Sequence, residues 1–242
     1  MANFSAPPKE EDAQLNYDWA LFDADKTLFD FNDKLGLEKL FAQHEFGFSE
    51  SEYQQYRTTN TNLWHDFEAG KIDSSKIKTT RFKPWEKQFN MKSSQINDRF
   101  IEMMIEICKP ITGAIELINN LHHHKVNLGM ITNGFNDLQQ KRLKKNGMCD
   151  KFKIVVTSEE ATHAKPSKKI FDYAFKKMNQ KNKDRVLMIG DNLDTDILGG
   201  QKYGIHTCWF NPYNKPMANH ILPQYQVSQL CELESIITDL NY

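Results

Sequence analysis

Two aspartates one residue apart are the first residues in this sequence whose types and spacing suggest chemistry. Asp23 and Asp25 follow the apolar run WALF (19–22), and Thr27 stands two residues further on. Two carboxylates at close range raise each other's pKa unless a cation lies between them. The pair therefore predicts a site for a divalent cation. The alternative is a turn held by hydrogen bonds from the aspartate side chains.

Three further groups of polar residues also follow apolar runs. Thr132 and Asn133 follow VNLGMI (126–131), and Lys165 comes after KIVVT (153–157). An acidic group follows RVLMI (185–189) and consists of Asp191, Asp194 and Asp196. Taken singly, each group has an ordinary explanation, such as a helix cap, a solvated lysine or aspartates that complement a helix dipole. Those explanations do not account for the order and spacing of all four groups together.

The elements that must position these residues are strands that alternate with helices. Four strand-length apolar runs stand out, HTCWF (206–210) and QYQVS (224–228) are further candidates, and amphipathic segments separate most of them. Nearly continuous apolar strands alternating with helices predict an α/β fold, with a doubly wound parallel sheet covered on both faces. Right-handed crossovers bring the carboxyl ends of all strands to one edge, where ligands bind. The polar groups should therefore meet there.

One interval breaks this alternation. Between about residues 33 and 108 apolar residues recur at helical spacing only, and Pro84 should kink one helix or start a new one. We therefore expect a helical cap domain over residues 33–108, inserted into a core domain formed by residues 17–32 and 109–242. Residues 1–16 are expected to form a mobile tail.

The composition argues against several classes of protein. The 242 residues include 31 Lys and Arg and 32 Asp and Glu, so charge gives no reason to expect a nucleic acid polymer or a membrane as partner. No apolar run approaches the ~18 residues of a membrane span, and the N-terminus has no apolar signal core. The four scattered cysteines indicate reduced thiols. These features favour a cytoplasmic protein and leave its oligomeric state open.

The four polar groups, in order, are similar to the four motifs of the haloacid dehalogenase (HAD) superfamily. They are DADKT, the TN of ITNG, the KP of AKPSKKIF, and GDNLDTD, and the resemblance covers nearly the whole chain from Tyr17 onward. Longer runs, including LWHDF and ITNGFNDLQQKRL, resemble the bacterial pyrimidine 5′-nucleotidases. This resemblance implies a Rossmann-like sheet of strand order 3-2-1-4-5 with a helical cap inserted after the first strand.

The resemblance also implies a metal-dependent phosphatase that works through a phospho-aspartate. Asp23 would be the nucleophile, and Asp25 would protonate the leaving oxygen and then activate water. Mg²⁺, or Mn²⁺ or another divalent cation, would bind the Asp23 and Asp191 side chains and the Asp25 backbone carbonyl. Because a halide needs no proton when it leaves, Asp25 favours phosphate esters over haloacids as substrates.

The remaining motif residues are expected to bind the phosphate or to hold the site in shape. The phosphate donors would be the Lys165 ammonium, the Thr132 hydroxyl, the Asn133 N–H and the loop amides near Ala24 and Asp25. Asp196, with Asp194 as the alternative, would orient Lys165 or a water on the metal. Thr27 would hydrogen-bond the loop with its hydroxyl.

Recognition of the leaving group should come from the cap, because the core holds only the phosphate. The candidate residues are Phe31, Trp64, Arg81 and Trp85, and the alternative for each aromatic residue is packing within the cap. Lys26 departs from the superfamily, which often has Gly there, and from the nucleotidases, which have an acidic residue. It could tighten phosphate binding, point into the cap, or be solvated.

We expect a nucleoside 5′-monophosphatase that favours UMP, dUMP, dTMP or altered pyrimidines. One alternative is a phosphatase for a sugar phosphate or phosphoglycolate. A protein of a different class, a catalytically silent HAD-like binding protein, is the second alternative. It would be expected to lack Asp23, Asp25, Lys165 or Asp191, and all four are present.

Overall fold

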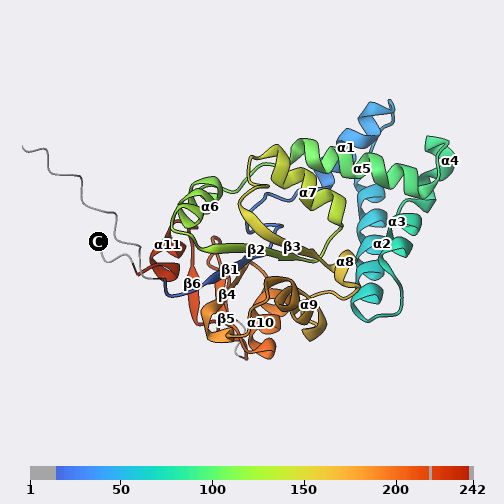
Figure 1. The fold of residues 1–242 in the computed structure, drawn as a ribbon. Helices are drawn as coiled ribbons and strands as arrows, with labels where there is room; N and C mark the ends of the chain where they lie inside the picture. Colours follow the sequence, from blue (N-terminus) through green and yellow to red (C-terminus); the bar gives the residue numbers. More distant parts are fainter. Residues whose placement is uncertain (1–14, 218–219, 240–242) are drawn as a thin grey trace, which may run out of the picture.

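The computed structural model describes residues 15–217 and 220–239. At the centre of this part of the chain is a parallel sheet of six strands (Figure 1). The strands are β1 (Trp19–Phe22), β2 (Asn127–Thr132), β3 (Phe152–Thr157), β4 (Val186–Gly190), β5 (His206–Phe210) and β6 (Tyr225–Val227). Their order is β3-β2-β1-β4-β5-β6, and each neighbouring pair is parallel. The predicted sheet of order 3-2-1-4-5 is confirmed, and β6 extends it beside β5.

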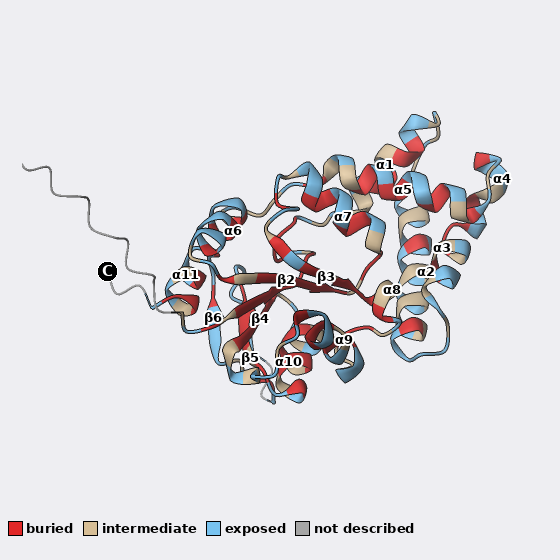
Figure 2. Cartoon of the chain, in the orientation of Figure 1, coloured by how far each residue is buried: buried red, intermediate tan, exposed pale blue. Residues whose placement is uncertain are grey.

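Alternate residues of β1 pack against helices on opposite faces of the sheet. Ala20 and Phe22 belong to a hydrophobic cluster with residues of α6 (Ala114–His123) and α11 (Glu232–Ile237). Trp19 and Leu21 belong to a second cluster, with residues of α9 (Lys168–Met178) and α10 (Leu198–Tyr203). Since successive side chains of a strand point to opposite faces, a fully apolar strand needs cover on both sides. Figure 2 shows the central strands buried between these layers.

The amphipathic segments between the strands form helices as predicted. In α9, for example, Ile170, Phe171, Ala174, Phe175 and Met178 are buried at helical spacing. The other elements in this part of the chain are α7 (Asn136–Lys145), α8 (Ser158–Ala161), the 3-10 helix η2 (Lys183–Arg185) and the π-helix η3 (Leu193–Ile197).

Only helices and their connections lie between β1 and β2 in the described chain. Before α6 they are α1 (Asp33–Gln43), α2 (Glu50–Glu68), α3 (Ser74–Thr80), η1 (Lys83–Trp85), α4 (Glu86–Phe89) and α5 (Ser93–Ile107). Pro84 lies at the start of the 3-10 helix η1, where its missing N–H leaves no helical hydrogen bond unmade. It therefore starts a new element, one of the two outcomes expected for it. The domain boundaries at residues 33 and 108 stay predictions.

These helices, which we call the cap helices, have a hydrophobic cluster of their own to one side of the sheet (Figure 1). The cluster also includes Phe135, Leu138 and Ala164 from segments that follow β2 and β3. The Lys145 ammonium at the end of α7 donates to the Ile105 and Glu106 carbonyl oxygens at 2.8 and 2.6 Å. The cap helices are thus packed against the carboxyl-end edge of the sheet.

The described chain begins at Leu15, which forms an antiparallel bridge with Thr238 near its other end. Residues 1–14 of the predicted tail lie outside the described residues. Asn16, which was predicted to belong to the tail, donates its backbone N–H to the Ile237 carbonyl oxygen at 2.9 Å, so the described chain is held from that point on. Among the described helices, none combines the length and the apolar character that crossing a membrane requires.

Candidate active site

The loops that follow β1, β2, β3 and β4 bring the predicted residues together at one edge of the sheet. Asp23 directly follows β1, Asn133 follows β2, and Asp191 follows β4. Lys165 comes after the short helix α8 that follows β3. Because all these strands are parallel, their carboxyl ends share one edge, as the sequence pattern predicted.

The Lys165 ammonium contacts residues of three other segments, namely the loop after β1, strand β2 and η3. It donates to Asp23 Oδ1 at 2.6 Å and to the Ile131 carbonyl oxygen at 2.6 Å, and it lies 2.7 Å from Asp196 Oδ1. The side chain is only 1% exposed. Burial alone would lower the pKa of Lys165, but the Asp196 and Asp23 carboxylates raise it overall. Lys165 is therefore a buried cation held in place by two anions.

Asp23, Asp191 and Asp196 form a compact acidic group. One carboxylate oxygen from each lies within 4.8 Å of the others. Burial, and then the nearby charge of Asp23, raises the pKa of Asp191 to about 6. Burial also raises the pKa of Asp196, although the Lys165 ammonium opposes it. Three carboxylates facing one ammonium leave two negative charges uncompensated, which fits a divalent cation with oxygen ligands.

The two candidates for the supporting carboxylate lie in different surroundings. Asp196 is 1% exposed, accepts from the Asn192 backbone N–H at 3.1 Å and contacts Lys165. Asp194 is exposed. Of the roles predicted for Asp196, positioning Lys165 is the one that these contacts support.

Asp25 forms an ion pair with Arg142, a residue that the sequence analysis did not single out. Arg142 lies on α7, is fully buried, and donates to Asp25 Oδ1 through Nη1. Burial raises the pKa of Asp25, and the Arg142 cation opposes that rise. A buried arginine near the end of a basic helix, in QQKRLKK, looks like a surface residue in sequence, so only its long-range pairing reveals it.

Backbone amides at the end of β1 are available for an anion. The Lys26 and Phe29 amides are used within the loop, donating to the Phe29 and Ala24 carbonyl oxygens. No hydrogen bond found within the described chain uses the amides of Ala24 and Asp25. These two amides are the ones expected to bind phosphate.

Thr132 and Asn133 lie where β2 ends. Thr132 is buried and pairs in register with Thr157 of β3. The Asn133 side chain accepts from the Lys165 backbone N–H at 2.8 Å and donates to the Lys165 carbonyl oxygen at 3.0 Å. These two bonds fix the β2 loop against the Lys165 loop. The predicted contacts of both residues with phosphate stay predictions.

Thr27 corrects one expectation. Its hydroxyl is buried, but it finds no hydrogen-bond partner within the described residues, so it does not bond the loop as predicted. The backbone bonds from Lys26 and Phe29 already close the turn.

A cavity of about 110 Å³ lies between the cap helices and the loops of the site. It is lined by Asp25 and Asn133 from the loops, and by three of the predicted recognition residues, Phe31, Trp64 and Arg81. Trp85 does not line it. That side chain is 4% exposed and packs edge-on against Phe41, with ring centroids 6.1 Å apart. Its contacts support packing, the alternative that the sequence analysis left open.

Arg81 is a buried cation with neutral hydrogen-bond partners. It donates to Asn97 Oδ1 from Nε at 2.9 Å and from Nη2 at 2.6 Å. The guanidinium carbon also lies 5.3 Å from the centroid of the Phe135 ring. Burial lowers the pKa of Arg81. Its positive charge is thus available to the cavity without a hydrogen-bonded carboxylate in the described chain.

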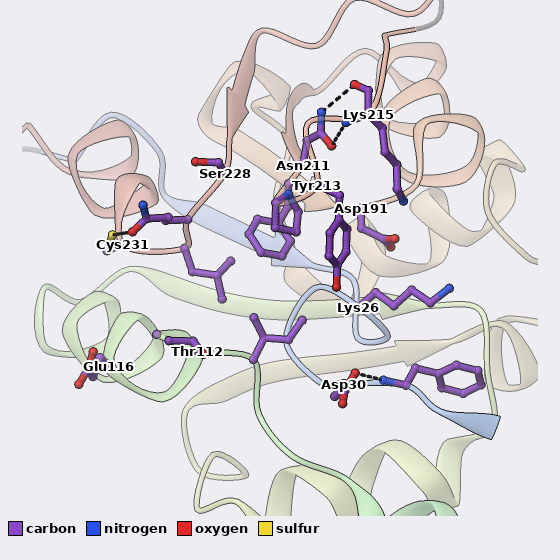
Figure 3. A pocket seen from close by; sticks show the side chains of 17 residues that line it. Lys26, Asp30, Thr112, Glu116, Asp191, Asn211, Tyr213, Lys215, Ser228 and Cys231 are labelled. Carbon is purple, nitrogen blue, oxygen red and sulfur yellow. Dashed lines mark hydrogen bonds between the residues drawn. The ribbon is translucent and has the colours of Figure 1, made fainter. Parts of the chain in front are cut away.

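Lys26 lines a second, larger cavity of about 700 Å³, and it does not line the cavity under the cap helices. Figure 3 shows Lys26, Tyr213 and Asp191 around this space. The Lys26 charge opposes the rise in the Asp191 pKa, so it acts on the acidic group. Its φ of 63° is in the left-handed region, a conformation that glycine adopts more easily than lysine does.

Comparison with known proteins identifies the family to which this chain belongs. The model for haloacid dehalogenase-like hydrolases matches residues 20–210. The chain belongs to this family. As a haloacid dehalogenase-like hydrolase it is an enzyme, and the matched region includes every motif residue described above.

Its relatives include two named pyrimidine 5′-nucleotidases. The hydrolase is 41% identical to pyrimidine 5′-nucleotidase YjjG of Escherichia coli over 92% of this chain and 99% of YjjG. It is 29% identical to pyrimidine 5′-nucleotidase PynA of Streptococcus pneumoniae over 87% of this chain and 91% of PynA. The resemblance to bacterial pyrimidine 5′-nucleotidases is thereby confirmed.

Solved structures agree with the fold of this hydrolase. The HAD-hydrolase YfnB of Bacillus subtilis, solved with bound magnesium, is 35% identical and superposes with a TM-score of 0.75 over 91% of this chain and 98% of YfnB. The L-2-haloacid dehalogenase of Xanthobacter autotrophicus has a TM-score of 0.70 at 16% identity over 91% of this chain and 98% of the dehalogenase, which shows a shared fold only.

Proposed function

We propose that this hydrolase removes the 5′-phosphate from pyrimidine nucleoside monophosphates such as UMP, dUMP, dTMP and altered pyrimidines. The observation that carries the proposal is the contact of Asp23 with the buried Lys165, next to a loop whose Asp25 lines an aromatic cavity. The relatives named pyrimidine 5′-nucleotidases support the same class of substrate.

In the proposed reaction Asp23 attacks the phosphorus atom and forms a phospho-aspartate as the bond from phosphorus to the 5′-oxygen breaks. Asp25 gives its proton to that leaving oxygen. Asp25 then takes a proton from the water that attacks the phosphorus, which releases inorganic phosphate and restores Asp23. The burial that raises the pKa of Asp25 favours the protonated form that the first step requires.

The charge on the transferring phosphoryl group needs fixed donors. Lys165 is held next to Asp23, and the amides of Ala24 and Asp25, in the same loop as Asp23, make no hydrogen bond within the described residues. Asn133 and Thr132 are proposed to complete the set from β2. Loss of one such donor typically costs about 3–4 kcal/mol of transition-state stabilisation.

A divalent cation, Mg²⁺ or Mn²⁺, fits the two uncompensated charges of the acidic group. The side chains of Asp23 and Asp191 and the backbone carbonyl of Asp25 would hold it. When bound, it would offset the negative charge of the carboxylates and the phosphate. Asp196 is engaged with Lys165 and is proposed to position that side chain.

The test is phosphate release from UMP, dUMP, dTMP, purine nucleotides, sugar phosphates and phosphoglycolate, with Mg²⁺, Mn²⁺ or a chelator. We expect turnover of the pyrimidine nucleotides above all others, and loss of turnover on chelation. Turnover confined to sugar phosphates would keep the chemistry and reject the substrate. Release of phosphate from none of them would reject the proposed function. That the enzyme is cytoplasmic stays a prediction.

A further inference from the structure

The side-chain amide of Gln139 is a buried polar group that the reaction described above does not use. Gln139 lies on α7, is fully buried, and lines the cavity under the cap helices. Its Nε2 finds no hydrogen-bond partner in the described chain. A buried donor without an acceptor is costly, by about 1–3 kcal/mol, so its place on a cavity wall points to an acceptor supplied by a ligand.

The atoms around the Gln139 amide show which of its two polar atoms, Oε1 or Nε2, lacks a partner. Gln139 Oε1 lies 3.5 Å from Arg142 Nη1, and a guanidinium can only donate, so the oxygen must be the atom on that side. The nitrogen lies beside Gly134, where an added Cβ would stand 3.1 Å from Nε2. The free group is therefore a donor, held near the loop that carries Thr132 and Asn133.

Several acceptors on the cavity wall are already paired with donors of the protein, including Asn60 Oδ1, which accepts from Arg81 at 3.4 Å. The Asp25 carboxylate is paired with Arg142, and the Asn133 side-chain oxygen already accepts from Lys165. The Arg81 guanidinium adds a positive charge whose hydrogen-bond partners are neutral. A ligand that complements this wall presents acceptor oxygens.

The shape and size of the cavity narrow the choice of ligand. Trp64 and Phe135 line it and pack against each other, with ring centroids 5.4 Å apart, so this wall offers aromatic surface for contact with a flat ring. Its volume of about 110 Å³ is several times the ~30 Å³ share of a water molecule but well below the ~300 Å³ of an ordinary ligand pocket. This space favours a single ring over a fused pair.

We infer that Gln139 donates a hydrogen bond from Nε2 to a ring carbonyl oxygen of the pyrimidine base. This inference rests on the proposed function and assigns the recognition of the base to α7 of the core as well as to the cap helices. Uracil and thymine each present two ring carbonyl oxygens, whereas ribose 5-phosphate keeps the sugar and phosphate but has no base. Gln139 thereby determines specificity and takes no part in the bond changes at phosphorus.

The test compares kcat/KM for UMP and for ribose 5-phosphate in Gln139→Leu and Gln139→Glu. The ratio of the two values should fall roughly 10- to 100-fold in both variants, the usual range for a buried hydrogen bond left without its partner. Gln139→Glu keeps an acceptor for Arg142 and offers the base no donor, so it serves if Gln139→Leu fails to fold. Gln140→Leu, at the exposed neighbouring glutamine, is the matched control.

An unchanged ratio would overturn the inference, whether both substrates lose equally or neither loses. Equal losses would mean that Gln139 acts through Arg142 and Asp25 and does not contact the base. If the wild-type enzyme itself does not prefer UMP to ribose 5-phosphate, the proposed function fails and the inference fails with it. Because that result appears in the wild type, the two failures are told apart.

Discussion

At the scale of single residues, the site is a set of buried charged side chains that stabilise one another. Asp23 accepts from Lys165, Lys165 also contacts Asp196, and Asp191 is left beside them with a raised pKa. Each group is costly to bury alone, and their mutual contacts lower that cost. A substitution at one of them should therefore affect chemistry far more than one at a neighbouring exposed acid.

Asp23→Asn should reduce phosphate release to background, because the amide keeps the size of the side chain but cannot act as the nucleophile. The measurement is phosphate release from UMP at saturating substrate. The control is Asp194→Asn, at an exposed aspartate of the same acidic run, which should stay within about twofold of wild type since surface changes cost little. Turnover by Asp23→Asn above a few per cent of wild type would refute the mechanism.

Asp25→Asn should lower stability as well as activity. It leaves the fully buried Arg142 guanidinium without its carboxylate, and breaking such a pair typically costs about 3–5 kcal/mol. Urea unfolding with chelator present would measure the loss in the free energy of unfolding.

The double variant Asp25→Asn/Arg142→Met removes both charges and should recover much of this stability while remaining inactive. If Asp25→Asn alone unfolds at the same urea concentration as wild type, the pair does not matter for stability.

At the scale of the elements, the end of β4 must let η3 approach closely. An added Cβ at Gly190 would lie 2.2 Å from Asp196 Oδ2 and 2.4 Å from Asp196 Cγ. Gly190→Ala should therefore displace the Asp196 carboxylate from Lys165 and lower kcat/KM for UMP by roughly 100-fold, as for loss of a positioned donor.

The matched control is Gly47→Ala, at an exposed glycine where an added Cβ meets nothing within 4 Å. It should leave kcat/KM unchanged. The idea fails if Gly190→Ala keeps near wild-type activity. Circular dichroism would check that the variant is folded.

The strands and helices were largely predictable because a sheet covered on both faces requires strands that are apolar at every position. A run such as WALF, apolar at every position, predicts a strand covered on both faces, and β1 has that environment. What could not be predicted depends on how side chains meet across the fold. The pairing of Arg142 with Asp25 joins residues on different elements, and the packing of Trp85 depends on Phe41 from a distant helix.

Thr27 shows the same limit within a motif. Its spacing from Asp25 is visible in the sequence, but whether its hydroxyl finds a partner depends on which backbone groups the turn has already used. The motif residues at strand ends could be predicted, whereas the contacts of each side chain could not.

At the scale of the whole molecule, the cap helices and the loops at the sheet edge enclose the cavity together. Two tryptophans of the cap helices have different roles there: Trp64 is expected to contact the substrate, and Trp85 to pack within the cap helices. Trp64 lines the cavity and lies against Phe135, so Trp64→Ala should raise KM for UMP with little change for ribose 5-phosphate, which has no base.

Trp85→Ala should instead lower the free energy of unfolding by about 3–5 kcal/mol, as expected for a large buried aromatic side chain. Its KM values for the two substrates should change together. If Trp64→Ala and Trp85→Ala both change only KM, or both change only the free energy of unfolding, the two tryptophans do not have different roles.

The position of β1 in the sheet has a consequence for the synthesis of the protein. Trp19 pairs with Asn127 on one side and with Val186 on the other, so the first strand to leave the ribosome becomes the centre of the sheet. At ~5–20 residues per second, the second partner of β1 follows it only after roughly ten to thirty seconds. During that time the run WALF lacks at least one neighbour and exposes an apolar edge, which favours aggregation of the newborn chain until β4 emerges.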